Sequence, residues 1–187
     1  FKVMKLPVVG VCVALAVTGA AQKPLDARGV FKKTAASVER IETPYSIGTG
    51  FSINGGKYIV TCRHVLEASE TESEGLVPIV SPIEVEVNGV PCVSILAEDW
   101  LLDIAILQVS KPLKSSLTLR AGSAEPGERA YTVGFPHGVA EHTISEGLVS
   151  AVRKLPLADT GLSAGVEEFV QTTAAISGGS SGSPLLD

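Results

Sequence analysis

Residues 171–187 contain the strongest chemical signal in the chain. Ser181 lies in a glycine-rich turn, with Gly179 before it and Gly182 after it, and this turn follows strand-forming residues at 169–173. A serine hydroxyl is a weak nucleophile, so an enzyme holds it on a tight loop beside a base and backbone N–H donors. Glycines let the backbone turn sharply and aim neighbouring amides at one point. The alternative is a flexible Gly/Ser linker, and the turn alone does not decide between the two.

His64 is the candidate base for this serine. An Asn54-Gly55 turn joins residues 48–53 to residues 57–66, a pattern that predicts a β-hairpin. The second strand of this hairpin delivers His64 at its end. A histidine held close to a serine can take the hydroxyl proton as the oxygen attacks.

Asp103 is the candidate partner of that base, because it directly precedes the apolar strand 104–107. Asp99 competes with it, but Asp99 lies in the approach to the strand, where we expect it to cap a turn. The order His, Asp, Ser along the chain suits a triad in which aspartate fixes the histidine tautomer. His137 and His142 follow the aspartate, which is the wrong order for the base.

Five blocks of the sequence resemble the trypsin-like serine proteases, and within that group the bacterial HtrA (Deg) type. They are Thr-Cys-Arg-His-Val at 61–65, Asp-Ile-Ala-Ile-Leu at 103–107, residues 133–138, residues 146–151 and the Ser181 loop. The resemblance spans about residues 30 to 187, with the blocks in the family's order. It implies an all-β fold of two antiparallel Greek-key β-barrels, hydrolysis of peptide bonds, and His64, Asp103 and Ser181 as the catalytic triad.

The same resemblance implies an oxyanion hole and a specificity pocket. The oxyanion hole would be formed by Gly179, Ser180 and Ser181, with the amides of the first and third as the pair, and the pocket base by Ala174, Ala175 and Ile176. None of the pocket residues is charged, which predicts small or medium aliphatic side chains rather than Arg or Lys in the substrate.

Two positions depart from the family pattern. Ser183 stands where a second glycine is usual, a small-for-small change, and Ser180 stands where HtrA members usually have asparagine and digestive members aspartate. The absence of a carboxylate at 180 argues against activation by a buried new N-terminus.

Composition excludes several other classes of function. The 187 residues are 45% hydrophobic and 19% charged and include 19 glycines, which is typical of a β-rich globular protein. The net charge of −5, with no basic run, argues against nucleic-acid binding. Acyl transfer by a triad needs no cofactor or metal, and the scattered histidines and cysteines predict no zinc site. A non-catalytic peptide-binding barrel stays open as an alternative, with protein or peptide partners in either case.

The chain is predicted to begin with a targeting segment at residues 1–21. Lys2 and Lys5 precede an apolar stretch at 6–17 that is followed by small residues, which is typical of a cleavable secretory signal, with a retained anchor as the alternative. This predicts an exported protein, periplasmic or secreted. A short amphipathic helix is predicted over residues 29–41 from its apolar spacing.

The rest of the chain divides into two predicted barrels. The helix and first barrel occupy residues 29–114, and the second barrel occupies residues 117–187. Only residues 182–187 follow the candidate nucleophile, so we expect the second barrel to be truncated at its C-terminus. Cys62 and Cys92 remain after removal of the leader, and whether they form a disulfide or lie packed and reduced is open at this stage.

Overall fold

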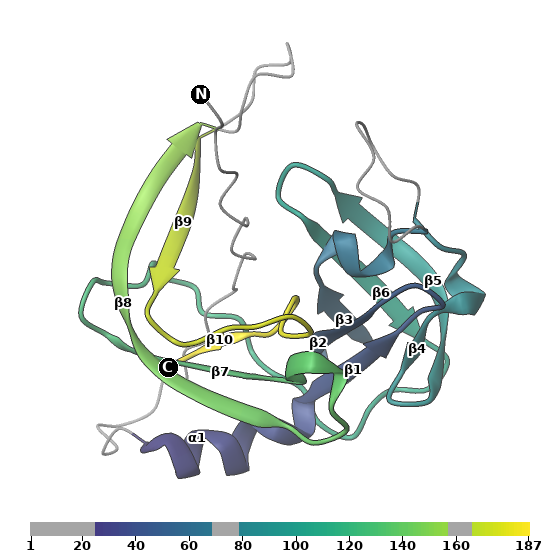
Figure 1. Ribbon diagram of the computed structural model, residues 1–187, viewed down its shortest axis with the longest axis horizontal. Coiled ribbons are helices and arrows are strands. Elements are labelled where there is room, and N and C mark those ends of the chain that lie inside the picture. Colours follow the sequence, from purple (N-terminus) through teal and green to yellow (C-terminus); the bar gives the residue numbers. More distant parts are fainter. Residues whose placement is uncertain (1–24, 69–78, 157–165) are drawn as a thin grey trace.

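The computed structural model describes residues 25–68, 79–156 and 166–187 (Figure 1). The predicted leader at residues 1–21 lies outside the described residues. The described part consists of a closed six-stranded barrel, a four-stranded sheet and one α-helix. This confirms the predicted all-β class with two β-units, and the second unit is not closed among the described residues.

The barrel is built from the first six strands. They are β1 (Val38–Glu42), β2 (Ile47–Ile53), β3 (Tyr58–Thr61), β4 (Glu86–Val87), β5 (Val90–Asp99) and β6 (Ile104–Val109), in the order β1-β2-β3-β6-β5-β4. Pairing of β1 with β4 closes the circle. In β6 the buried residues alternate with half-buried ones, which is the period of a strand with one face in a core.

The second unit is an antiparallel sheet in the order β10-β7-β8-β9. Its strands are β7 (Arg129–Gly134), β8 (Thr143–Pro156), β9 (Val166–Thr172) and β10 (Leu185–Leu186). In Figure 1 the chain between β9 and β10, drawn in yellow, runs from this sheet toward the barrel. The loop that contains Ser181 is part of that segment.

A shared apolar cluster joins the two units and α1 (Ala27–Thr34). Phe51 and Val60 of the barrel, Tyr131 and Val133 of the sheet, and Val30 of the helix all belong to it. Asp26 caps the N-terminus of this helix, because its carboxylate accepts a hydrogen bond of 2.8 Å from the amide of Gly29. The barrel has a second core of its own, in which Ile41, Ile59 and Leu107 are completely buried.

The predicted helix over 29–41 is wrong in its second half. The helix covers Ala27–Thr34, a 3₁₀ turn follows at Ala35–Ser37, and β1 begins at Val38. Val38 pairs with Phe51 and Ile41 with Gly48, so sheet pairing determines the conformation of this stretch. The apolar spacing at 38 and 41 suits a strand once a partner is present, and periodicity over so short a stretch does not separate the two.

The predicted hairpin before His64 is confirmed, with one difference at its end. Asn54 and Gly55 both have positive φ, 51° and 66°, as the turn between β2 and β3 requires. The strand itself stops at Thr61, and His64 lies on a 3₁₀ turn, η2 (Arg63–Leu66).

Cys62 and Cys92 are both buried, and no disulfide joins them. Within the described ranges, no helix has the length and apolar character needed to cross a membrane.

Candidate active site

His64 and Asp103 form a fixed pair at one end of the barrel. His64 Nδ1 and Asp103 Oδ2 are 2.6 Å apart, and the backbone amide of His64 donates to Asp103 Oδ1 at 2.9 Å. The amide of Arg63 also donates to the carbonyl oxygen of Asp103 at 3.1 Å. Asp103 has a φ of 54°, a left-handed conformation that aspartate tolerates better than most residues. Three hydrogen bonds therefore hold the aspartate against the turn that contains the histidine.

The charges of this pair support each other. The hydrogen bond that His64 makes to Asp103 raises the pKa of His64. Burial lowers this pKa, and the negative charges of Asp103 and Glu67 raise it further, so the net shift is upward. Burial raises the pKa of Asp103, but hydrogen bonds and charge from His64, with a further hydrogen bond from Cys62, outweigh burial and hold it below its ordinary value. An ionised Asp103 that accepts from Nδ1–H leaves Nε2 of the neutral ring as a proton acceptor.

Arg63 clamps the turn next to the histidine. Its buried guanidinium donates to Glu98 Oε2 at 2.7 Å and to Glu67 Oε1 at 2.9 Å, which ties η2 to β5. The sequence analysis did not identify this contact. Asp99 caps a turn as expected, because its Oδ1 accepts from the amides of Leu101 and Leu102.

The loop around Ser181 is anchored on the barrel by Thr49 of β2. The amide of Thr49 donates to the carbonyl oxygen of Ser181 at 2.8 Å, and its hydroxyl donates to the carbonyl oxygen of Gly179 at 2.7 Å. The same hydroxyl accepts from the amide of Phe135 at 3.0 Å. One buried threonine thus links the barrel, the serine loop and the end of β7. Sequence reasoning missed it, although a polar residue between two glycines in a strand was a visible signal.

Gly182 seats this loop against the strand ends that lead to His64. Its φ is 87°, and a Cβ there would lie 2.0 Å from the carbonyl oxygen of Thr49 and 3.0 Å from the amide nitrogen of Cys62. Cys62 is two residues before His64, so the serine loop and the histidine turn share one corner of the barrel. In the described part of the chain, no hydrogen bond joins Ser181 Oγ to His64 Nε2. In unliganded enzymes such bonds are often long and tighten only with substrate.

The backbone amides around Ser181 have different partners. The amide of His137 donates to the carbonyl oxygen of Gly178 at 2.5 Å. The C=O and N–H groups of a trans peptide point in opposite directions, so the N–H of Gly179 points away from His137. The amide of Ser180 donates to Ser177 O at 2.9 Å. The amides of Gly179 and Ser181 have no acceptor among the described residues. Of the three residues predicted for the oxyanion hole, these two retain an amide available to a ligand.

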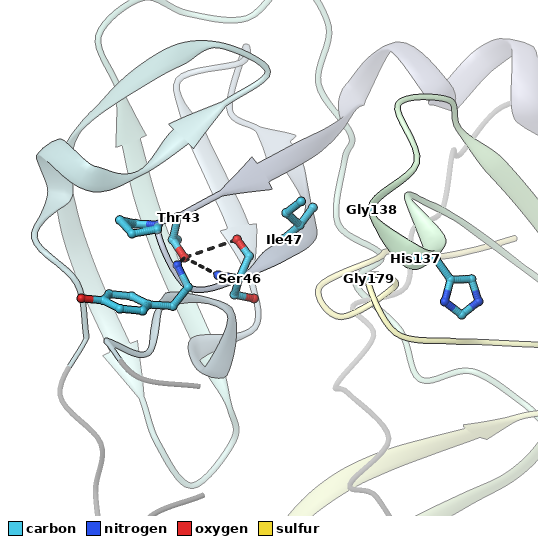
Figure 2. Close-up of a pocket in the computed structure, with 8 residues that line it drawn as sticks. Thr43, Ser46, Ile47, His137, Gly138 and Gly179 are labelled. Atoms are coloured by element: carbon cyan, nitrogen blue, oxygen red, sulfur yellow. Dashed lines mark hydrogen bonds between the residues drawn. The ribbon is translucent and has the colours of Figure 1, made fainter. Parts of the chain in front are cut away.

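Two hollows flank the serine loop. One, of about 410 Å³, lies between the turn from β1 to β2 and the Gly138 and Gly179 backbones (Figure 2). In that turn, the amide of Ser46 donates to Thr43 Oγ1 at 3.0 Å. The other hollow, of about 300 Å³, is lined by β7, β8 and the loop before Ser181. Ala175 and Ile176, two of the three residues named for the pocket base, line this hollow, whereas Ala174 is buried against Gly147.

Comparison with known proteins identifies the family. The model of the trypsin-like peptidase domain matches residues 48–187. The chain belongs to this family. It is 32% identical to the mitochondrial serine protease HTRA2 of Bos taurus over 84% of this chain and 35% of that protein. It is 30% identical to a periplasmic serine endoprotease DegP-like protein of Pseudomonas savastanoi pv. phaseolicola, over 82% of this chain and 29% of that protein.

A solved structure agrees with this assignment. The crystal structure of Deg5 has a TM-score of 0.63 and 28% identity, and the match covers 86% of this chain and 78% of that one. The predicted resemblance to trypsin-like proteases of the HtrA type is confirmed by these similarities. The chain spans about a third of the length of the curated relatives it matches.

Proposed function

We propose that this chain is the protease domain of a serine endopeptidase, with Ser181 as nucleophile, His64 as general base and Asp103 as the residue that orients the base. The observation that supports it best is the 2.6 Å contact between His64 Nδ1 and Asp103 Oδ2. With Asp103 ionised, this contact favours a ring proton on Nδ1, which leaves Nε2 to accept a proton. The attachment of the Ser181 loop to Thr49, at the same corner, adds the nucleophile.

The proposed reaction runs through an acyl-enzyme. His64 Nε2 takes the Ser181 hydroxyl proton as Oγ attacks the substrate carbonyl carbon, and the resulting oxyanion accepts from the amides of Gly179 and Ser181. The C–N bond then breaks, and the imidazolium gives its proton to the leaving amine. Water, deprotonated by His64, hydrolyses the ester and restores the serine.

The substrates proposed are proteins or peptides with small or medium aliphatic side chains before the cleaved bond. Ala175 and Ile176 line an uncharged hollow beside the loop, and a cationic side chain would find no charged partner among these pocket residues. A cleavage profile on a peptide library tests this, and dominance of Arg or Lys at that position would contradict it. Because one relative is named as periplasmic, we also propose that the protein is exported. A role in protein quality control is a further part of the proposal and rests on the resemblance to the HtrA type.

The decisive experiment replaces the nucleophile in the complete protein. Ser181→Ala is expected to lower kcat for peptide hydrolysis by about 10⁶-fold, because triad members act as a unit. It should also abolish labelling by a serine-directed fluorophosphonate. Ser180→Ala and Ser183→Ala are the matched controls and should cost far less. Equal losses of kcat in Ser181→Ala and Ser183→Ala would show that the nucleophile is misassigned. A wild-type protein that the fluorophosphonate does not label would favour a peptide-binding barrel without catalysis.

A further inference from the structure

A third potential ligand lies beside the proposed catalytic pair. One ligand atom each from Cys62, His64 and Asp103, a sulfur, an imidazole nitrogen and a carboxylate oxygen, all lie within 4.8 Å of one another. The Cys62 side chain donates a hydrogen bond to the Asp103 carboxylate. The proposed protease mechanism makes no use of this thiol.

The three side chains form a site that is open on one side. Cys62 is only 2% exposed and lies at the bottom, whereas the side chains of His64 and Asp103 are 44% and 22% exposed. A cation can therefore reach the carboxylate and the imidazole from solvent and then contact the sulfur. The scattered histidines and cysteines of the sequence predicted no zinc site. Asp103 is 39 residues from His64 along the chain, and the fold brings the two together.

We infer that Cys62, His64 Nδ1 and Asp103 form an inhibitory zinc site. A set of one sulfur, one nitrogen and one oxygen suits Zn²⁺, whose tetrahedral site would take water as the fourth ligand. Bond lengths of about 2.3 Å to sulfur and about 2.0–2.1 Å to nitrogen and oxygen place tetrahedral ligand atoms about 3.3–3.6 Å apart. The Nδ1–Oδ2 separation of 2.6 Å would have to widen by less than about 1 Å to reach this range.

The protons and charges of this step balance. Zinc binds the thiolate of Cys62, and the thiol proton goes to solvent. Zinc also replaces the proton on His64 Nδ1, and a neutral ring with a metal at Nδ1 carries its proton on Nε2. The thiolate and the Asp103 carboxylate together offset the charge of the ion. The bound complex is therefore neutral, which suits a half-buried location.

Inhibition follows from the change of tautomer. With its proton on Nε2, the imidazole has no lone pair left to accept the Ser181 proton, so the base is switched off while Ser181 stays unmodified. This part of the inference rests on the proposed function, whereas metal binding itself does not. Mg²⁺ and Ca²⁺ prefer oxygen ligands, so they should neither bind the thiolate nor inhibit.

The binding test uses Co²⁺ as a spectroscopic substitute for Zn²⁺ in the complete protein with Ser181→Ala, which needs no activity. Co²⁺ should give a thiolate-to-metal charge-transfer band that competing Zn²⁺ removes. The band should be lost when Cys62→Ala is added and retained when Cys92→Ala is added. Cys92 is the matched control, a buried thiol of the same barrel whose sulfur contacts the carbonyl oxygen of Ser94.

The inhibition test compares Zn²⁺ titrations of peptide hydrolysis, each variant normalised to its own rate without metal. Cys62→Ala should raise the inhibitory Zn²⁺ concentration by more than about 100-fold. Replacing a residue that only hydrogen-bonds to a metal ligand already lowers metal affinity by about 10- to 100-fold, and Cys62 would be a ligand itself. Cys62→Val, with a thermal melt for both, controls for altered packing. Equal inhibition of wild type and Cys62→Ala, or a cobalt band that survives it, would overturn the site. A band without inhibition would overturn the switch, and an inactive wild type with a Cys62-dependent band would contradict only the proposed protease.

Discussion

The two halves of the proposed site are built in different ways. The base half, His64 with Asp103, is held by hydrogen bonds within the closed barrel, and the Arg63 clamp adds support from β5. The nucleophile half is a loop between β9 and β10 of the open sheet, yet two of its hydrogen bonds join it to the barrel, through Thr49 of β2. The barrel therefore determines the chemistry of the base, whereas contacts between the two units determine the alignment of the serine.

The first way to test this comparison is to change the chemistry of the base half without moving it. Asp103→Asn keeps an oxygen that can accept from the His64 amide, but its NH₂ group favours the wrong histidine tautomer. We expect kcat to fall by about 10⁴-fold with little change in the melting temperature. Asp99→Asn is the control, because Asp99 only caps a turn. A similar fall of kcat in both variants would show that activity depends on the conformation of this turn and not on the histidine tautomer.

The second test moves the nucleophile half and leaves the base intact. Gly182→Ala places a methyl group 2.0 Å from Thr49 O at a φ of 87°, so the loop must shift. We expect activity to fall by at least about 100-fold, since small misplacements of reacting groups cost that much. The unfolding free energy should also fall by about 2 kcal/mol or more. Gly178→Ala is the matched control, because a Cβ there meets nothing within 4 Å. Comparable kinetics for the two variants would contradict the anchoring.

The third test removes the link between the halves. Thr49→Val keeps the shape of the side chain but loses the hydroxyl that bonds Gly179 O and Phe135 N. Two lost buried hydrogen bonds should cost about 1–3 kcal/mol, and kcat/KM should fall by about 10- to 100-fold. Thr49→Ser keeps the hydroxyl and should restore most of the activity. Equal kcat/KM values for Thr49→Val and Thr49→Ser would show that the hydroxyl does not align the loop.

The smallest effect on activity is expected from Glu39 of β1, which lies in the barrel away from the site. Burial raises the pKa of Glu39 to about 7, although a hydrogen bond with Ser52 opposes it. A raised folded-state pKa gives stability that is complete below the unfolded value of 4.5 and is lost as pH rises toward 7. Glu39→Gln should therefore flatten the pH dependence and add about 2–3 kcal/mol of unfolding free energy at pH 8.

Urea unfolding at pH 4 and pH 8 measures the effect of Glu39→Gln, with peptide hydrolysis as the check on activity. Glu86→Gln, on the exposed face of β4, is the control. If the unfolding free energy of Glu39→Gln depends on pH as it does in the wild type, another group of the barrel causes that dependence.

Local chemistry explains what could be predicted from the sequence. The Asn54-Gly55 turn, the alternation of β6 and the glycines around Ser181 each express a backbone preference that needs no distant partner. The order of His64, Asp103 and Ser181 within recognisable blocks was enough to predict the family, which the trypsin-like peptidase match confirms. The sequence therefore contained all three residues of the proposed triad in recognisable form.

Contacts over long sequence distances explain what the sequence did not determine. Thr49 bonds a residue 130 positions away, and the stretch from Val38 became a strand because β2 pairs with it. The same holds for Cys62, which the sequence presents as an ordinary packed residue but which lies beside Asp103 in the folded chain. Backbone turns and side-chain periods are properties of neighbouring residues, so the sequence alone determined them. Which hydroxyl, thiol and carboxylate meet depends on the register and closure of the barrel, so only the tertiary structure decided it.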